Sequence, residues 1–171
     1  MLDSNRLHIV SFNIPYPPNY GGVIDVFYKI KELHKLGVKV YLHCFEYDRS
    51  QQSVLENYCE EVFYYKRASP IKSFFSFIPF IIKSRENELL VKQLKKIKAP
   101  ILFEGLHTTF SLTKIVFNAS IYVRAHNIEH EYFKGLAKSE SNVFKKLFYL
   151  LESSKLKKYE SILNKATGVF S

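Results

Sequence analysis

Hydrophobic residues in this chain alternate between short β-branched runs and longer stretches with helical spacing. Residues 7–13 form an apolar run of the kind found in strands, and a loop rich in proline and glycine follows over residues 14–22. The next apolar residues recur at helical spacing: Val23, Phe27, Ile30, Leu33 and Leu36. Gly37 follows where a helix C-cap belongs. This pattern predicts a strand, a loop and a helix.

The same alternation continues to the end of the chain. Further runs have the length and composition of strands: residues 38–45, 61–66, 100–104, 120–125 and a beginning run at 168–171. Between them, helical patterns occur around residues 53–59, 108–117 and 143–163. Strands that alternate with helices pair in parallel and are covered on both faces. The sequence therefore predicts an α/β, Rossmann-like three-layer domain over residues 1–171, with a mainly parallel sheet of about six strands.

Composition supports one globular domain and adds a strong positive charge. Hydrophobic residues make up 47% of the 171 residues, and the net charge is +9. The excess lies in residues 66–98, with a net charge of +7, and in residues 134–171, with +5. This clustering indicates an anionic surface or ligand, such as phospholipid or a phosphate-bearing substrate. The basic segments lack an RNA-recognition aromatic pattern, a zinc knuckle or a helix-turn-helix, so no nucleic-acid partner is expected.

Cysteine spacing and the start of the chain bear on the compartment. Cys44 and Cys59 are too far apart for a CxxC redox or zinc pair. Asp3 lies where a signal peptide would need only positive charge, and the apolar stretch behind it is too short for a signal core. We therefore expect a cytoplasmic protein without an export signal.

The loop before the first helix is a candidate ligand site. Gly21 and Gly22 open that helix, where a phosphate or a sugar can approach the backbone N–H groups at its positive end. The loop is neither a Rossmann GxGxxG nor a P-loop, which excludes the usual dinucleotide and ATP motifs. A tight turn stiffened by prolines explains the same residues about equally well.

A second polar segment, residues 123–131, follows the fifth predicted strand. Arg124, His126 and Asn127 are candidate site residues because the carboxyl ends of parallel strands face the ligand crevice of such sheets. His126 and His130 are four residues apart, as in a zincin, but the HExxH pattern is absent and no third ligand is evident, so no metal is expected. A purely structural histidine is the alternative for His126.

Glu104 and His107 form a third polar cluster, after the fourth predicted strand. Loops that follow parallel strands meet at one edge of the sheet, so the three clusters should converge on one crevice. Such convergence favours a binding site over three unrelated loops.

Residues 71–83 are apolar on nearly every side and precede a basic segment. The stretch is too short to span a bilayer, and Pro79 would interrupt it. Two alternatives are equally favoured. Either Phe74, Phe77 and Ile78 insert into a membrane interface or contact an acceptor, or the stretch is a buried helix that packs under the sheet or covers a cleft.

The chain resembles the N-terminal domain of retaining GT-B glycosyltransferases of the group 1 (family 4) type. The likeness rests on IVSFNIPYPPNYGGVIDVFYKIKELHKLGVKVYLHCF at the start, and on VRAHNIEHEYF, a long basic helix and ATGVFS at the end. It covers essentially the whole chain and is weakest over residues 48–98.

This resemblance implies a cytoplasmic enzyme of cell-surface polysaccharide synthesis. Such an enzyme transfers a sugar from a nucleotide-sugar donor to a saccharide or lipid-linked acceptor. No metal or other cofactor is expected. Gly21 and Gly22 match the loop near the donor phosphates, and His126 matches the histidine at the donor sugar. The resemblance places the donor mainly on a C-terminal domain that the chain lacks, so the chain by itself is expected to be inactive. A non-catalytic peripheral membrane or interaction module at the inner face of the cell membrane is the alternative.

Overall fold

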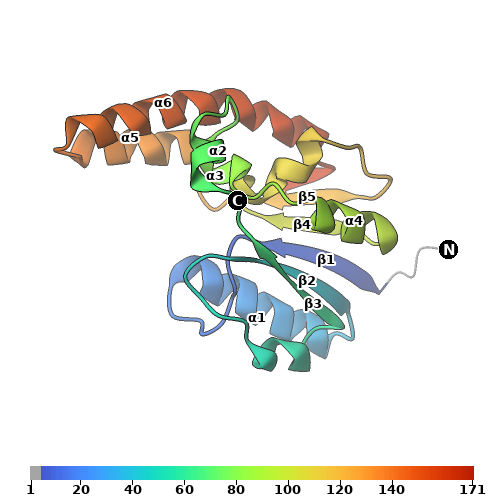
Figure 1. Cartoon of the computed structure of the whole chain (residues 1–171). Coiled ribbons are helices and arrows are strands. Elements are labelled where there is room, and N and C mark those ends of the chain that lie inside the picture. Colours follow the sequence, from blue (N-terminus) through green and yellow to red (C-terminus); the bar gives the residue numbers. More distant parts are fainter. Residues whose placement is uncertain (1–4) are drawn as a thin grey trace.

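The predicted strands form one six-stranded sheet in the computed structural model, which describes residues 5–171 except for the side chains of residues 71 and 72 (Figure 1). The strands are β1 (Arg6–Ser11), β2 (Lys39–Glu46), β3 (Glu61–Lys66), β4 (Ile101–Glu104), β5 (Ile121–Arg124) and β6 (Gly168–Phe170). Their order is β3-β2-β1-β4-β5-β6, and every neighbouring pair is parallel. This order confirms the predicted Rossmann-like α/β class. Residues 1–4, on which the prediction about an export signal partly depends, lie outside the described residues.

Helices cover both faces of the sheet. The α-helices are α1 (Gly21–Lys35), α2 (Pro70–Phe74), α3 (Phe80–Lys83), α4 (Glu88–Lys96), α5 (Glu129–Ser139) and α6 (Val143–Tyr159). Three segments are 3-10 helices: η1 (Ser53–Asn57), η2 (Leu106–Thr113) and η3 (Glu160–Lys165). Figure 1 shows α1 on one side of the sheet and α4, α5 and α6 on the other. This arrangement gives the three layers that the strand and helix pattern predicts.

The alternation of side chains along the central strand β1 divides the core in two. Ile9 belongs to the cluster beneath α1, together with Val26 and Ile30. Val10, the next residue, belongs to the cluster on the opposite face, which includes Leu94 of α4. Because successive side chains of a strand point to opposite faces, an apolar run with no polar interruption fits a strand that is buried on both sides. The faces of the sheet are thus filled, and loops gather at its edges.

Several predicted segments differ from the structure. The helical patterns of residues 53–59 and 108–117 correspond to the 3-10 helices η1 and η2. The apolar stretch 71–83 is two short helices, α2 and α3, and not one buried helix, because Pro79 begins a new helix in place of continuing the first. The predicted helix over residues 143–163 ends at Tyr159 and continues as η3. In addition, α6 buries little of its apolar surface, since Phe144, Leu147 and Leu151 are exposed. Among residues 5–171 no helix combines the length and the apolar character needed to cross a membrane.

Candidate functional site

Three predicted clusters meet at the carboxyl edge of the sheet. Glu104 and Arg124 are the last residues of β4 and β5 and stand opposite each other in the strand register. The loop after β1 leads to Gly21, the first residue of α1. His126 lies in the loop between β5 and α5. Parallel pairing places all these strand ends on one side, which is why segments far apart in the chain become neighbours.

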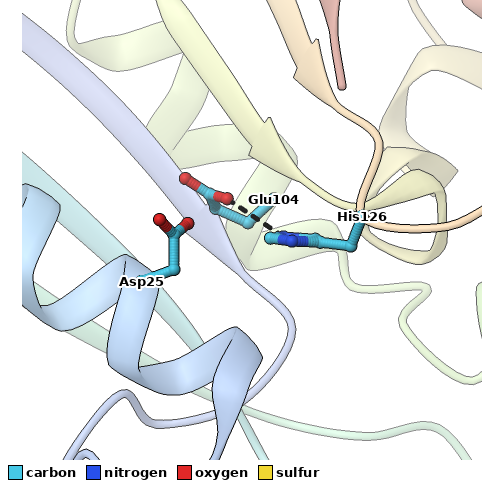
Figure 2. A group of neighbouring side chains, drawn as sticks. All are labelled: Asp25, Glu104 and His126. Atoms are coloured by element: carbon cyan, nitrogen blue, oxygen red, sulfur yellow. Dashed lines mark ion pairs between the residues drawn. The ribbon is translucent and has the colours of Figure 1, made fainter.

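Glu104 is the central carboxylate of this edge and is fully buried. Its Oε1 accepts a hydrogen bond from Nζ of Lys29 at 2.5 Å, and its Oε2 lies 3.2 Å from Nε2 of His126 (Figure 2). Neither Oε2 of Glu104 nor Nε2 of His126 forms a hydrogen bond among the described residues, although both atoms are buried. Glu104 and His126 therefore lie at ion-pair distance without a hydrogen bond between them.

Asp25 of α1 joins the same group through two cations. Its Oδ2 lies 2.6 Å from Nη1 of Arg124 and 3.2 Å from Nζ of Lys29. Partial burial alone would raise the pKa of Asp25, but Lys29 and Arg124 outweigh it and the pKa is lowered. Asp25 is consequently ionised at neutral pH.

Asp25, Glu104 and His126 together offer ligand atoms for a cation. Ligand atoms of Asp25, Glu104 and His126 lie within 4.8 Å of one another, and Figure 2 shows the side chains converging. However, Lys29 and Arg124 already balance the two carboxylates, and a divalent ion would have to displace at least one of these cations. The arrangement is better described as an ion-pair network than as a metal centre.

The two glycines of α1 have different surroundings. A Cβ atom on Gly22 would lie 2.6 Å from Cζ of Phe12, whereas a Cβ atom on Gly21 would meet nothing within 4 Å. The Phe12 ring in turn packs edge-on against His107 and His126, with ring centroids 5.1 and 5.9 Å apart. Gly22 therefore makes room for the ring that supports both histidines. No side chain caps the first N–H groups of α1, which leaves its positive end available to an anion.

His107 is buried to a similar extent as His126. Its Nδ1 is 3.6 Å from Oε1 of Glu129, the first residue of α5. Burial lowers the pKa of His107 although Glu129 acts in the opposite direction. His107 is therefore neutral at neutral pH and can exchange hydrogen bonds without adding charge to the site.

A cavity of about 700 Å³ opens beside these groups. Four of the predicted site residues line it: Gly22, His107, His126 and Asn127. The remaining lining residues are Phe12, Tyr20, Ile81, Arg85, Glu129, Tyr132 and Phe133. A larger cavity of about 910 Å³ lies at the opposite edge of the sheet and contains none of the predicted site residues. The volume of the first cavity lies within the range found for small-molecule sites.

Sequence reasoning missed several members of this site. Asp25 and Lys29 were not singled out, although they follow Gly21 by one and two helical turns and so share its face of α1. Phe12 and Arg85 gave no local signal, because an aromatic residue at a strand end and an arginine in a basic run are ordinary features. Gly21 and the ion-paired Glu104 and Arg124 lie at this edge but do not line the cavity.

The predicted membrane or acceptor residues form a separate surface. Phe74 and Phe77 are exposed, the latter by 99%, together with Phe75, whereas Ile78 is half-buried and packs against the core. Ile78 also lines a cavity beside Phe77, so its role as a surface contact stays a prediction. Phe74 stacks on Phe148 of α6 with ring centroids 5.6 Å apart.

Lysines lie next to this aromatic surface. Phe77 shares a cavity of about 440 Å³ with three lysines at the end of α6 and in η3: Lys155, Lys158 and Lys165. Exposed aromatic rings beside several positive charges form an amphipathic surface, distinct from the cavity at the carboxyl edge.

Comparison with known proteins gives a genetic context. No protein-family model matches the chain. The chain is 32% identical over 155 residues to an uncharacterized 44.6 kDa protein in the cps region of Klebsiella pneumoniae. The match covers 86% of this chain and 40% of that relative, so the chain spans well under half the length of the relative.

Proposed function

We propose that this chain forms the acceptor-side half of a retaining glycosyltransferase that acts in polysaccharide synthesis. The observation that carries the proposal is the meeting of three features at the carboxyl edge of the sheet: the glycine loop, His126 beside Glu104, and one cavity. The relative from a capsule (cps) gene region supports a role connected with polysaccharide. The resemblance to GT-B enzymes supports the kind of reaction.

In this proposal the chain contributes electrostatics and positioning. The uncapped N–H groups at Gly21 and Gly22 stabilise negative charge that develops on the leaving diphosphate. Nδ1 of His126 accepts a hydrogen bond from a hydroxyl of the reacting sugar and holds its anomeric carbon beside the acceptor. Glu104 acts through His126 as a positioning residue, and Lys29 pairs with the buried carboxyl group of Glu104. No side chain of the chain serves as a nucleophile in this scheme.

The nucleotide of the donor is assigned to a further domain, in keeping with the partial coverage of the relative. The acceptor is a saccharide, free or lipid-linked, and it occupies the cavity lined by His107, Asn127 and Tyr132. By itself the chain is therefore expected to bind the acceptor but not to catalyse sugar transfer.

A sugar-transfer assay tests the proposal. The protein expressed from its complete reading frame is incubated with a panel of nucleotide sugars and with lipid and saccharide extracts, and release of the nucleotide is followed by chromatography. We expect release from at least one donor, and a product whose anomeric proton coupling matches that of the donor. Absence of release with every donor and acceptor, or a product of inverted configuration, would count against the proposal.

A peripheral membrane contact is a second candidate function, and the surface of Phe74, Phe75 and Phe77 favours it. These rings are exposed, and Phe77 lies next to the lysines of α6 and η3. Aromatic and basic side chains on one surface are suited to anionic lipid, since rings enter the interface and lysines contact head groups. Such a contact would bring the site to a lipid-linked acceptor, and it would also serve a non-catalytic module.

Vesicle sedimentation measures this contact. The chain should pellet with phosphatidylglycerol vesicles at low salt and with phosphatidylcholine vesicles much less. Phe75→Ser with Phe77→Ser should reduce binding about tenfold or more. Val116→Ser is the matched control, because Val116 is 91% exposed and lines the cavity at the opposite edge of the sheet. Equal loss in the control, or no binding to either vesicle, would eliminate this candidate.

A further inference from the structure

Arg85 is a buried cation that the proposed mechanism does not use. It follows α3, is only 8% exposed and lines the cavity at the carboxyl edge. Its Nη1 donates to the carbonyl oxygen of Ile81 at 2.6 Å, and its Nη2 donates to that of Phe12 at 3.1 Å. Its Nε has no hydrogen-bond partner, and within residues 5–171 no carboxylate lies at ion-pair distance from it.

The two carbonyl contacts account for the position of Arg85 but not for its charge. They fasten the segment after α3 to the end of β1, which neutral donors could also do. Burial lowers the pKa of Arg85 to about 9, so the guanidinium still carries its charge at neutral pH. The carboxylate of Glu129 attracts this charge, but it does not form an ion pair with Arg85. A buried charge without a directly bonded counter-ion is unfavourable, and proteins usually pair it. A ligand anion can supply that direct partner.

The other groups around the cavity limit the ligand chemistry. Gly22, at the positive end of α1, adds to the favourable potential for an anion. Glu129 is the carboxylate among the lining residues, and it suits hydroxyl donors better than a second anion. Asn127 and Tyr132 offer further neutral hydrogen bonds. The cavity is therefore matched to a molecule that has one anionic group and several hydroxyls.

We propose that Arg85 binds the anionic group, a phosphate or a carboxylate, of an acidic sugar acceptor in this cavity. Guanidinium groups bind both anions through their N–H donors. Nη1 and Nη2 of Arg85 each donate one N–H to a carbonyl oxygen, which leaves a second N–H on each nitrogen for an anion. That the bound sugar is the acceptor rests on the glycosyltransferase function proposed above. The binding itself can be measured on this chain alone.

The test uses glucose 6-phosphate, glucuronate and glucose as probes, titrated into ¹⁵N-labelled protein at low ionic strength. At least one anionic probe should bind about tenfold more tightly than glucose, because a hydrogen bond to a charged group is worth roughly 1.5 to 3 kcal/mol. Amide shifts should concentrate at Gly22, His107 and Asn127. Tighter binding of glucose 6-phosphate would identify the ligand class as a sugar phosphate. Tighter binding of glucuronate would identify it as a sugar carboxylate.

Two variants distinguish the contribution of Arg85 to anion binding from that of positive charge in general. Arg85→Gln should weaken binding of the anionic probe about tenfold and leave glucose unchanged. Arg67→Gln is the control, since Arg67 is a half-buried arginine that binds Ser84 and does not line the cavity. It should bind within about twofold of the parent chain. If Arg85→Gln does not fold, the titrations of the parent chain decide by affinity and by the location of the shifts.

Several results would overturn the inference: equal binding of all three probes, no binding, or shifts centred on Lys95 and Lys96 at the opposite edge. Equal weakening by Arg67→Gln and Arg85→Gln would do the same. This experiment is independent of catalysis. Sugar transfer to neutral acceptors without anion binding refutes this inference alone, whereas anion binding without transfer refutes the proposed function alone.

Discussion

At the scale of single residues, Gly21 and Gly22 are adjacent but have different roles. Gly22 is required by packing, because the Phe12 ring occupies the space where its side chain would be. Gly21 faces open space, and its backbone lies outside the left-handed region, so an alanine fits there. A motif of two glycines thus contains one steric requirement and one position that is free for a ligand.

This difference gives a paired prediction. Gly22→Ala should lower the free energy of unfolding by about 1 to 3 kcal/mol, because the new methyl group overpacks against Phe12. Gly21→Ala should leave it unchanged or raise it by up to about 1 kcal/mol, because alanine restricts the unfolded chain. Urea unfolding measures both. Equal effects of the two variants would contradict the packing argument.

Glu104 is the residue on which the ion-pair network depends. Glu104→Gln keeps the size of the side chain but leaves Lys29 without its partner at the buried end. We expect a loss of about 2 to 3 kcal/mol of unfolding free energy, which is less than for a fully buried pair because Lys29 is partly exposed. Glu32→Gln, which removes the exposed pair with Lys35, should cost about 0.5 kcal/mol or less. Similar losses in both variants would argue against a special role of Glu104.

At the scale of elements, a buried hydrogen-bond chain connects strands β1, β2 and β3. Nε2 of His8 lies 2.9 Å from the carbonyl oxygen of Ile97, and Nδ1 of His8 lies 2.8 Å from Nε2 of His43. Nδ1 of His43 lies 2.8 Å from the hydroxyl of Tyr65. If both rings are neutral, each donates from Nε2 and accepts at Nδ1, and the Tyr65 hydroxyl donates to His43. Every donor and acceptor of this hydrogen-bond chain then has a partner, and neither imidazole ring is charged.

This hydrogen-bond chain makes the free energy of unfolding depend on pH. Burial lowers the pKa of His8 and of His43 below the ordinary value of 6.5, so the unfolded state takes up protons first as the pH falls. The stabilisation is complete above pH 6.5 and decreases below it, by about 1.4 kcal/mol per pH unit for each histidine that stays neutral.

Urea unfolding at about pH 7.5 and pH 5.5 should show this decrease. His34→Gln should retain the decrease, since His34 is exposed on α1, while His43→Gln should reduce it. An unfolding free energy that is constant over this pH range would contradict the assignment of His8 and His43 as neutral in the folded protein.

The elements differ in how far the sequence predicts them. The strands follow from their β-branched runs, and α1 follows from its apolar spacing and from Gly37, whose φ of 74° suits glycine. The division of residues 71–83 into α2 and α3 depends on Pro79 and on tertiary contacts: Glu152 of α6 accepts the N–H of Phe80 at 2.5 Å. Such a contact joins residues far apart in the chain, and a local pattern cannot predict it.

At the scale of the whole molecule, parallel topology explains why the site could be partly predicted. Once strands and helices alternate, Gly22, Glu104 and His126 must lie at one edge, and they do. Arg85 and Phe12 could not be found in this way, because their importance lies in burial and in the ring packing between loops. The chemical roles of the predicted residues stay predictions.

The distribution of charge has two consequences at this scale. One cation, Arg85, is buried at the cavity, while Lys155, Lys158 and Lys165 lie around the exposed Phe77. The first arrangement suits a single acidic ligand, and the second suits an extended anionic surface. If both proposals hold, the protein binds an acidic acceptor while it contacts a membrane.

The most direct test of the central claim is donor turnover by the protein from its complete reading frame, compared with His126→Ala and with His34→Ala as the control. The account predicts that His126→Ala lowers the rate about 100-fold, because the reacting sugar is no longer positioned. His34→Ala should stay within about twofold of the parent, because it changes an exposed residue away from the site. A His126→Ala protein as active as the parent would contradict the assignment of this edge of the sheet as the site of sugar transfer.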